Sequence, residues 1–233
     1  GSRRISRKAS RRSSPAPDLG SRLRLDSRAR SRGHGAMASW SQSQRLETVL
    51  GVILSEGAHT VLDLGCGDGD LLVLLAAEPQ IERIVGVDLC RKTLERARER
   101  VAACLDGQPE SLARPWIERV ELVHDSFMET GDRFRGFDCA VLVETIEHLE
   151  PQRLSVLERA IFGSMRPATV VITTPNAELN PFLDVPWSEG VARRNDYRVA
   201  CSTLAGRHPR FGGATQMAVF RRAHVPLDQS KAP

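Results

Sequence analysis

The sequence predicts a single α/β domain whose sheet of seven strands is mostly parallel, with an antiparallel last strand and helices on both faces. Short apolar runs alternate with helical segments along the chain, which is typical of βαβ units. The runs are nearly continuous in Val, Ile and Leu, as expected of parallel strands buried on both faces. With 233 residues, 41% of them hydrophobic, the chain can bury one substantial core.

The elements follow in order. Leu46, Val49, Leu50 and Ile53 recur at helical spacing, which predicts a helix over 44–54 that packs against the sheet edge. Five apolar runs predict the first strands, and the segments between them predict the covering helices. The expected strands are 60–64, 83–87, 119–123, 138–143 and 169–173, and the expected helices are 70–77, 91–105 and 151–162.

The end of the chain has a different pattern. A helical segment at 187–194 precedes two strand-like runs, 197–201 and 215–221, which a loop rich in glycine separates. Two late strands joined by a short loop favour antiparallel pairing. We therefore expect the domain to span 39–222 and residues 223–233 to be a frayed, polar end.

The first residues carry most of the positive charge. Residues 1–36 hold 11 Lys and Arg against two Asp, so the remainder of the chain is acidic, with 22 basic against 27 acidic residues. Few apolar residues offset the entropy of ordering this segment, so we expect 1–38 to be a disordered basic tail. Three interpretations stay open: an anchor for RNA phosphates, a targeting segment, or a tag remnant with sequence preceding Met37.

The cysteines and the hydropathy of the chain bear on its expected location in the cell. The five cysteines are scattered without CxxC spacing, which favours free thiols over disulfides or a zinc site. No apolar run approaches the roughly 20 residues that span a membrane. We expect a cytoplasmic monomer that does not bind membranes.

A glycine-rich turn follows the first predicted strand. Gly65, Gly67 and Gly69 allow the backbone a tight turn and a close approach to a ligand. Asp88 ends the next strand, 19 residues after Gly69, near the interval at which a carboxylate can bind both hydroxyls of a ribose. The pattern therefore predicts a site for a nucleotide-type cofactor.

A second motif follows the fourth predicted strand. The strand carries Glu144 to the sheet rim, and Glu147 and His148 come just after it. Ligands of open α/β sheets bind along this rim. Two carboxylates and an imidazole suit Mg²⁺ or Mn²⁺, so these three residues are the predicted metal ligands and catalytic residues.

The spacing of the glycine turn, with Asp63 before it, resembles that of the Rossmann-like class I S-adenosylmethionine-dependent methyltransferases. The resemblance implies that the turn from Asp63 lies along the methionine part of the cofactor, that Asp88 binds the ribose and that Asp125 meets the adenine. The cofactor-binding residues expected from it are Asp63, Gly65, Cys66, Gly67, Asp88, Leu89, Asp125 and Ser126.

A narrower resemblance rests on the run from Glu144 to Leu149, on Phe162-Gly163, and on the runs from Thr173 to Asn180 and from Thr215 to Phe220. Together they resemble the small-RNA 3′-terminal 2′-O-methyltransferases, over about 42–222. The resemblance implies methylation of the 2′-hydroxyl of the last nucleotide of small RNA. It also implies a metal held by Glu144, Glu147 and His148 that binds both terminal hydroxyls.

The chain departs from that family in one segment. The fourth metal ligand, a histidine, should lie between Asn180 and the helix containing Trp187, where only Pro181 to Pro186 are present. We expect His208, later in the chain, to be a loop residue and not a replacement. The alternative is therefore a catalytically impaired variant that binds cofactor or a partner. The RNA class, silencing RNA or RNA under repair, and any protein that presents its end stay open.

Overall fold

The computed structural model describes residues 35–105, 116–129, 131–175, 195–208 and 212–223. Residues 38–233 form one compact unit, which holds every element below except the first three residues of α1. Its helices are α1 (Gly35–Ser55), α2 (Asp70–Ala77), α3 (Arg91–Leu105), α4 (Trp116–Arg119) and α5 (Pro151–Glu158), with short 3₁₀ helices η2 (Gly131–Phe134) and η3 (Ile146–His148) and a π-helix η4 (Arg159–Met165). Its strands are β1 (Thr60–Leu64), β2 (Arg83–Asp88), β3 (Val120–His124), β4 (Cys139–Val143), β5 (Thr169–Pro175), β6 (Tyr197–His208) and β7 (Gly212–Arg222).

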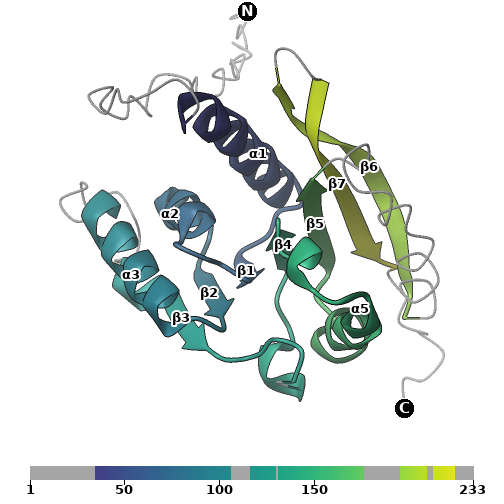
Figure 1. The fold of residues 1–233 in the computed structure, drawn as a ribbon. Coiled ribbons are helices and arrows are strands. Elements are labelled where there is room, and N and C mark those ends of the chain that lie inside the picture. Colours follow the sequence, from purple (N-terminus) through teal and green to yellow (C-terminus); the bar gives the residue numbers. More distant parts are fainter. Residues whose placement is uncertain (1–34, 106–115, 130, 176–194, 209–211, 224–233) are drawn as a thin grey trace, which may run out of the picture. The chain divides into compact units, whose positions relative to one another are not determined.

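The seven strands form one sheet in the order β3-β2-β1-β4-β5-β7-β6. The pairs from β3 to β5 are parallel, and β7 runs antiparallel to both β5 and β6. Helices α1, α2 and α3 lie on one side of the sheet and α5 on the other (Figure 1). The predicted fold class, with its antiparallel last strand, is confirmed.

Side chains of each strand alternate between two cores because successive residues of a strand point to opposite faces. In β1, Val61 belongs to the core beneath α1 and α2, and Leu62 and Leu64 belong to the core on the α5 side. Helix α3 buries Leu94, Ala97 and Val101, which recur every three or four residues. The near-continuous apolar strands therefore reflect burial on both faces.

Several boundaries differ from the predicted ones. Helix α1 begins nine residues before the predicted start, and its apolar residues pack in a core on one face of the sheet instead of at its edge. The helix predicted over 151–162 is α-helical only to Glu158 and continues as a π-helix to Met165, which buries Phe162 against Tyr197 and Phe220. Strands β6 and β7 are longer than predicted because they pair with each other almost end to end.

Three further predictions concern short segments. The helix predicted at 187–194 lies outside the described residues, and so do residues 181–186, where the fourth metal ligand of the family was expected. His208, expected in a loop, is the last residue of β6 and pairs with Gly212. The five cysteines, all within the described ranges, form no disulfide, and no described helix combines the length and apolar character needed to cross a membrane.

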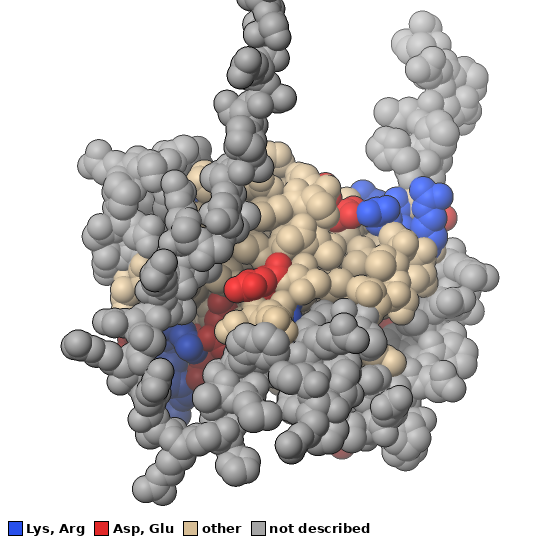
Figure 2. All heavy atoms as spheres, turned by 90° about the horizontal axis from the view of Figure 1, so that it is seen from above, with Lys and Arg blue, Asp and Glu red and all other residues tan. Residues whose placement is uncertain are grey.

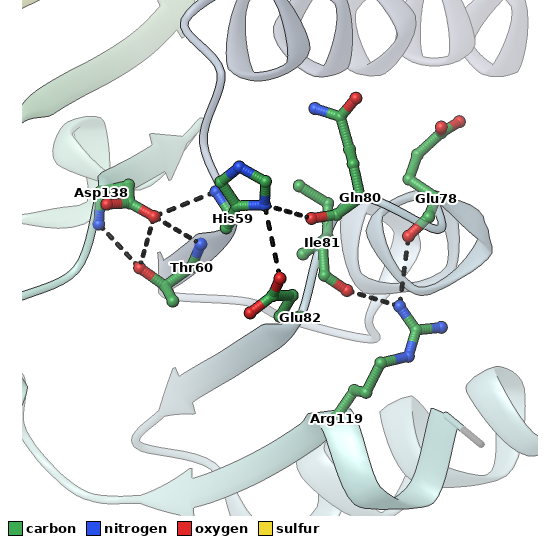
Figure 3. Close-up of polar contacts among 8 residues, drawn as sticks. All are labelled: His59, Thr60, Glu78, Gln80, Ile81, Glu82, Arg119 and Asp138. Atoms are coloured by element: carbon green, nitrogen blue, oxygen red, sulfur yellow. Dashed lines mark hydrogen bonds and ion pairs between the residues drawn. The ribbon is translucent and has the colours of Figure 1, made fainter. Parts of the chain in front are cut away.

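Polar contacts fix the start of β1 beside the start of β4 (Figure 3). The Asp138 carboxylate accepts hydrogen bonds from the backbone N–H groups of His59 and Thr60, at 3.0 and 2.9 Å, and one from the Thr60 hydroxyl at 2.9 Å. In return, the Thr60 hydroxyl oxygen accepts the Asp138 N–H at 2.8 Å. Burial raises the pKa of Asp138, but these hydrogen bonds outweigh it and hold the pKa below its ordinary value.

Arg119 caps the end of α2 from a distant part of the chain. Its side chain is buried, and it donates to the carbonyl oxygens of Glu78 and Ile81 (Figure 3) and to that of Ala76. Carbonyls in the last turn of a helix have no partner within the helix, so a guanidinium placed there satisfies them. The prediction that 119 begins a strand is wrong by one residue because Arg119 ends the short helix α4.

Replacing Arg119 by Met should lower the free energy of unfolding by about 3 kcal/mol, because buried carbonyls lose a charged donor. Urea unfolding followed by circular dichroism measures this change. The matched control is Arg83→Met, since the Arg83 side chain is 56% exposed and its pair with Glu121 is 3.5 Å long. Equal stabilities of the two variants would contradict the capping role.

Candidate active site

A cavity of about 450 Å³ opens at the rim where β1, β2 and β4 end. Seven of the eight predicted cofactor residues line it, together with Glu144 and His148 of the second motif. Helix α1 contributes Gln42, Arg45 and Leu46 to its wall. The two motifs, about 80 residues apart in the sequence, therefore face one cavity, as expected for parallel strands whose carboxyl ends share a rim.

The glycine turn is built by backbone conformations that favour glycine. Gly65, Gly67 and Gly69 have φ angles of 82°, 54° and 83°. The N–H groups of Gly65 and Cys66 both donate to the carbonyl oxygen of Val87, at 2.8 and 3.1 Å. This ties the turn to the end of β2, next to Asp88.

Thr145 joins the two motifs. A Cβ atom at Gly65 would lie 2.7 Å from Cγ2 of Thr145, so only a glycine fits beside this side chain. The Thr145 hydroxyl lies 3.2 Å from the carbonyl oxygens of both Leu64 and Val143, which end β1 and β4. The turn and the Glu144 motif are thus in direct contact.

Asp88 has its carboxylate fixed by two backbone groups. Oδ2 accepts the N–H of Gly67 at 3.1 Å and Oδ1 accepts the N–H of Cys90 at 2.8 Å. Each carboxylate oxygen can accept a further hydrogen bond. A ligand hydroxyl in the cavity could therefore bind Asp88 in a fixed orientation.

Asp63 is buried at the base of the turn, with 2% of its surface exposed. Burial, with the nearby charge of Asp88 as a second cause, raises the pKa of Asp63 to about 7. A positively charged group bound in the cavity would favour the ionised form of this carboxyl. The site is thus suited to a ligand that carries positive charge.

Asp125 is the predicted cofactor residue that does not line the cavity. Its Oδ1 accepts the N–H of Ser126 at 2.8 Å, and its Oδ2 pairs with Arg133 at 3.1 Å. Both oxygens are used locally, at a loop after β3. Ser126, the next residue of this loop, does line the cavity.

Glu144 directly follows β4 and has a left-handed conformation, with a φ angle of 52°. Thr173, fully buried in the neighbouring strand β5, holds it by two contacts. The Glu144 N–H donates to the Thr173 hydroxyl oxygen, and that hydroxyl donates to Glu144 Oε1, both at 3.1 Å. Burial raises the pKa of Glu144; Arg45 opposes the rise and Glu147 adds to it.

Glu147 and His148 lie on the 3₁₀ helix η3. Burial raises the pKa of Glu147, and its Oε2 is buried without a hydrogen-bond partner. His148 is exposed at the cavity. Glu147 does not line the cavity, although it lies close enough to Glu144 to shift its pKa.

The donor types at this place fit a divalent cation. Two carboxylates and an imidazole are ligands that Mg²⁺ or Mn²⁺ accepts, and Glu147 keeps an unpaired buried oxygen. Within the described part of the chain, however, no three His, Cys, Asp or Glu side chains converge closely enough to hold a metal ion. Arg45 is instead the cation in contact with Glu144, at 3.4 Å.

The sequence analysis gave no role at this site to three residues that the structure brings to it. Arg45, Thr173 and Thr215 reach Glu144 or one another from α1, β5 and β7. Thr173 and Thr215 begin two of the runs that carried the family resemblance, but nothing in those runs indicated contact with Glu144 or Arg45. One signal could have suggested Arg45, since it directly precedes Leu46 on a helix predicted to pack on the sheet.

Comparisons with known proteins agree with this geometry. A family described as "Methyltransferase domain" matches residues 61–168. The small RNA 2′-O-methyltransferase of Rattus norvegicus is 32% identical over 212 residues, which cover 81% of this chain and 53% of the relative. The small RNA 2′-O-methyltransferase of Mus musculus is 33% identical over 202 residues, which cover 77% of this chain and 50% of that relative. The chain thus spans about half the length of the curated relatives it matches.

Similarity to solved structures identifies the family of this chain. The methyltransferase domain of bacterial CtHen1-C is 35% identical, with a TM-score of 0.67, and the match covers 79% of this chain and 100% of that domain. The small RNA methyltransferase HEN1 is 26% identical, with a TM-score of 0.65, over 79% of this chain and 25% of that structure. Because the match takes in the whole bacterial domain at this identity, the chain belongs to the Hen1 family of methyltransferases.

Proposed function

We propose that this chain transfers a methyl group from S-adenosylmethionine to the 2′-hydroxyl of the 3′-terminal nucleotide of a small RNA. The observation that carries the proposal is the single cavity faced by both motifs, in a chain of the Hen1 family. A methyl donor and a ribose hydroxyl must meet in one place for direct transfer. The contact of Thr145 with Gly65 keeps their two binding elements adjacent.

The cofactor would lie along the glycine turn. Asp88, held by Gly67 and Cys90, is oriented to accept the ribose hydroxyls of S-adenosylmethionine. Asp63 would carry a negative charge near the positive charges of the methionine and sulfonium groups. Leu89, 61% exposed, offers an apolar contact beside the adenosine part.

The RNA end would approach from the side of Glu144. In the transfer, the 2′ oxygen forms a bond to the methyl carbon while the bond from that carbon to sulfur breaks, its electron pair stays on sulfur, and the hydroxyl proton passes to water. A divalent cation at Glu144, Glu147 and His148 would supply Lewis acidity that lowers the pKa of the bound hydroxyl. Thr173 orients Glu144 for this role, because it fixes both its backbone and its carboxylate.

Attraction between basic side chains and the phosphates of the RNA would help the RNA to bind. On the face drawn in Figure 2, the described Lys and Arg atoms gather mainly in two separate groups at opposite margins, with Asp and Glu atoms and uncharged surface between them. The basic residues of 1–36 lie outside the described residues. We propose that they supply part of the attraction for the RNA phosphates, which salt would weaken.

The proposal is tested by transfer of labelled methyl from S-adenosylmethionine to a short RNA with a 2′,3′-dihydroxyl end, with and without Mn²⁺. We expect transfer only with metal, and none to RNA that ends in a 3′-phosphate. Glu147→Gln should lower the rate at least about 100-fold, because it removes a carboxylate from the metal site. The matched control is Glu150→Gln, since Glu150 is exposed three residues away and should keep full activity.

A second candidate function has one structural observation and one feature of the sequence in its favour. The described residues hold no converged set of metal ligands, and the sequence lacks the segment expected to carry a fourth ligand. A chain that binds cofactor and RNA without turnover would fit this arrangement. Cofactor binding by calorimetry, with no transfer at any Mn²⁺ concentration, would favour this impaired variant over the enzyme.

Asp63 gives a prediction for pH dependence. Its pKa of about 7 in the folded chain means that it is largely neutral at pH 6 and ionised at pH 8. A cationic cofactor should bind the ionised form, so the Kd of S-adenosylmethionine should fall roughly 10-fold between pH 6 and pH 8. Calorimetry at these two pH values measures the change.

The control for this prediction is Asp63→Asn. It should bind S-adenosylmethionine more weakly and with little dependence on pH in the same range, because the group that titrates is gone. A wild-type Kd that does not change between pH 6 and pH 8 would contradict the role of Asp63. In the absence of cofactor the opposite trend holds for stability, since the raised pKa makes the folded chain lose stability as pH rises from about 4 toward 7.

A further inference from the structure

Arg45 provides a positive charge inside the acidic part of the cavity. It comes from α1, lines the cavity, and its Nη1 lies 3.4 Å from Glu144 Oε2. The side chains are only 16% and 21% exposed, respectively. A partly buried ion pair of this kind makes up for part of the cost of removing two charges from water.

The pair is loosely made. One nitrogen, Nη1, is shared between Glu144 and the hydroxyl of Thr215, which lies at 3.3 Å, and Nε is buried without a hydrogen-bond partner. Strong arginine–carboxylate pairs use two parallel hydrogen bonds at shorter distances. Arg45 thus lies near Glu144 but lacks the paired hydrogen bonds of a strong arginine–carboxylate contact, so it can be displaced.

The positive charge of Arg45 does not balance the negative charge of the carboxylates around it. Glu147 lies close enough to raise the pKa of Glu144, and its own Oε2 is buried without a partner. One guanidinium therefore faces two half-buried carboxylates, together with the exposed imidazole of His148. A doubly charged ion would neutralise this pair of acids better than Arg45 does.

We infer that Arg45 is a displaceable internal cation, which competes with a divalent ion for Glu144 Oε2 and must leave this oxygen for the ion to bind there. The inference rests on the proposed function, because it takes Glu144 and Glu147 as the metal ligands. Thr215 already accepts a hydrogen bond from the same nitrogen at 3.3 Å, so Arg45 would keep one partner after it leaves Glu144. Metal binding is thereby coupled to a movement of the Arg45 side chain on α1, and Arg45 lowers the affinity of the site for the metal.

The experiment measures Mn²⁺ binding to the full chain by electron paramagnetic resonance, with no RNA or cofactor present. Arg45→Met removes the competing charge, so it should bind Mn²⁺ at least about 10-fold more tightly than the wild type. Arg45→Lys keeps a positive charge and should bind less tightly than Arg45→Met. The matched control is Arg83→Met, which removes an arginine from an exposed pair at 3.5 Å and should leave the Mn²⁺ affinity unchanged.

A purely structural role for Arg45 gives a different result. Loss of a structural ion pair would loosen the site, so Mn²⁺ affinity equal to or weaker than that of the wild type in folded Arg45→Met would overturn the inference and leave metal-dependent methyl transfer untouched. If Arg45→Met does not fold, Arg45→Gln, which keeps a hydrogen-bond donor, is held to the same expectation. Failure of every variant to bind Mn²⁺ would overturn both this inference and the metal in the proposed function.

The location of the ion is checked by Glu144→Gln in the Arg45→Met background. We expect this change to abolish the gain in Mn²⁺ affinity, because the carboxylate released by Arg45 is then absent. Retention of the tighter binding in the double variant would show that the ion binds elsewhere, and would overturn the competition at Glu144.

Discussion

The parallel pairing of β1 with β4 is the constraint on which the candidate site depends. Val61, Leu62 and Asp63 pair with Cys139, Ala140 and Val141, so the two strands end together at one rim. A slip of one residue would turn every side chain of a strand to the opposite face. Asp138 and Thr60 act against such a slip, because they exchange hydrogen bonds at the opposite ends of the same two strands.

Charge gives the site a second level of organisation. The cavity is lined by Asp63, Asp88 and Glu144, with Glu147 close behind Glu144. Asp88 raises the pKa of Asp63, and Glu147 raises that of Glu144. Such pairs are costly unless a positive charge lies nearby. The first pair would receive it from a cationic cofactor, and the second has Arg45 in this structure. The same physical requirement thus connects cofactor binding with the proposed exchange at Glu144.

The sequence predicted what short patterns determine. The predicted bounds of β1, α2 and α3 coincide with the observed ones, because each is specified by its own apolar spacing and by a neighbouring turn. The glycine turn and the Glu144 motif were predicted to share a rim, and they do, since parallel strands of one sheet end on the same side. The assigned roles of their residues stay predictions.

The rest depends on packing between distant segments. Arg45, Thr173 and Thr215 meet Glu144 or each other only because α1, β5 and β7 pack around it, and Arg119 caps a helix that ends more than 40 residues earlier in the chain. The full lengths of β6 and β7 come from their mutual pairing, and the π-helix after Glu158 accompanies burial of Phe162. No local spacing encodes these contacts.

The left-handed backbone at Glu144 has an evolutionary consequence. A φ angle of 52° is unfavourable for a glutamate and suits glycine or asparagine. A lineage of this protein released from selection for its chemistry would therefore gain stability by replacing this residue, and position 144 should be among the first of the motif to drift. A glutamate retained there across related sequences would mark lineages that still need its carboxylate, whereas glycine or asparagine would mark those that keep only the fold.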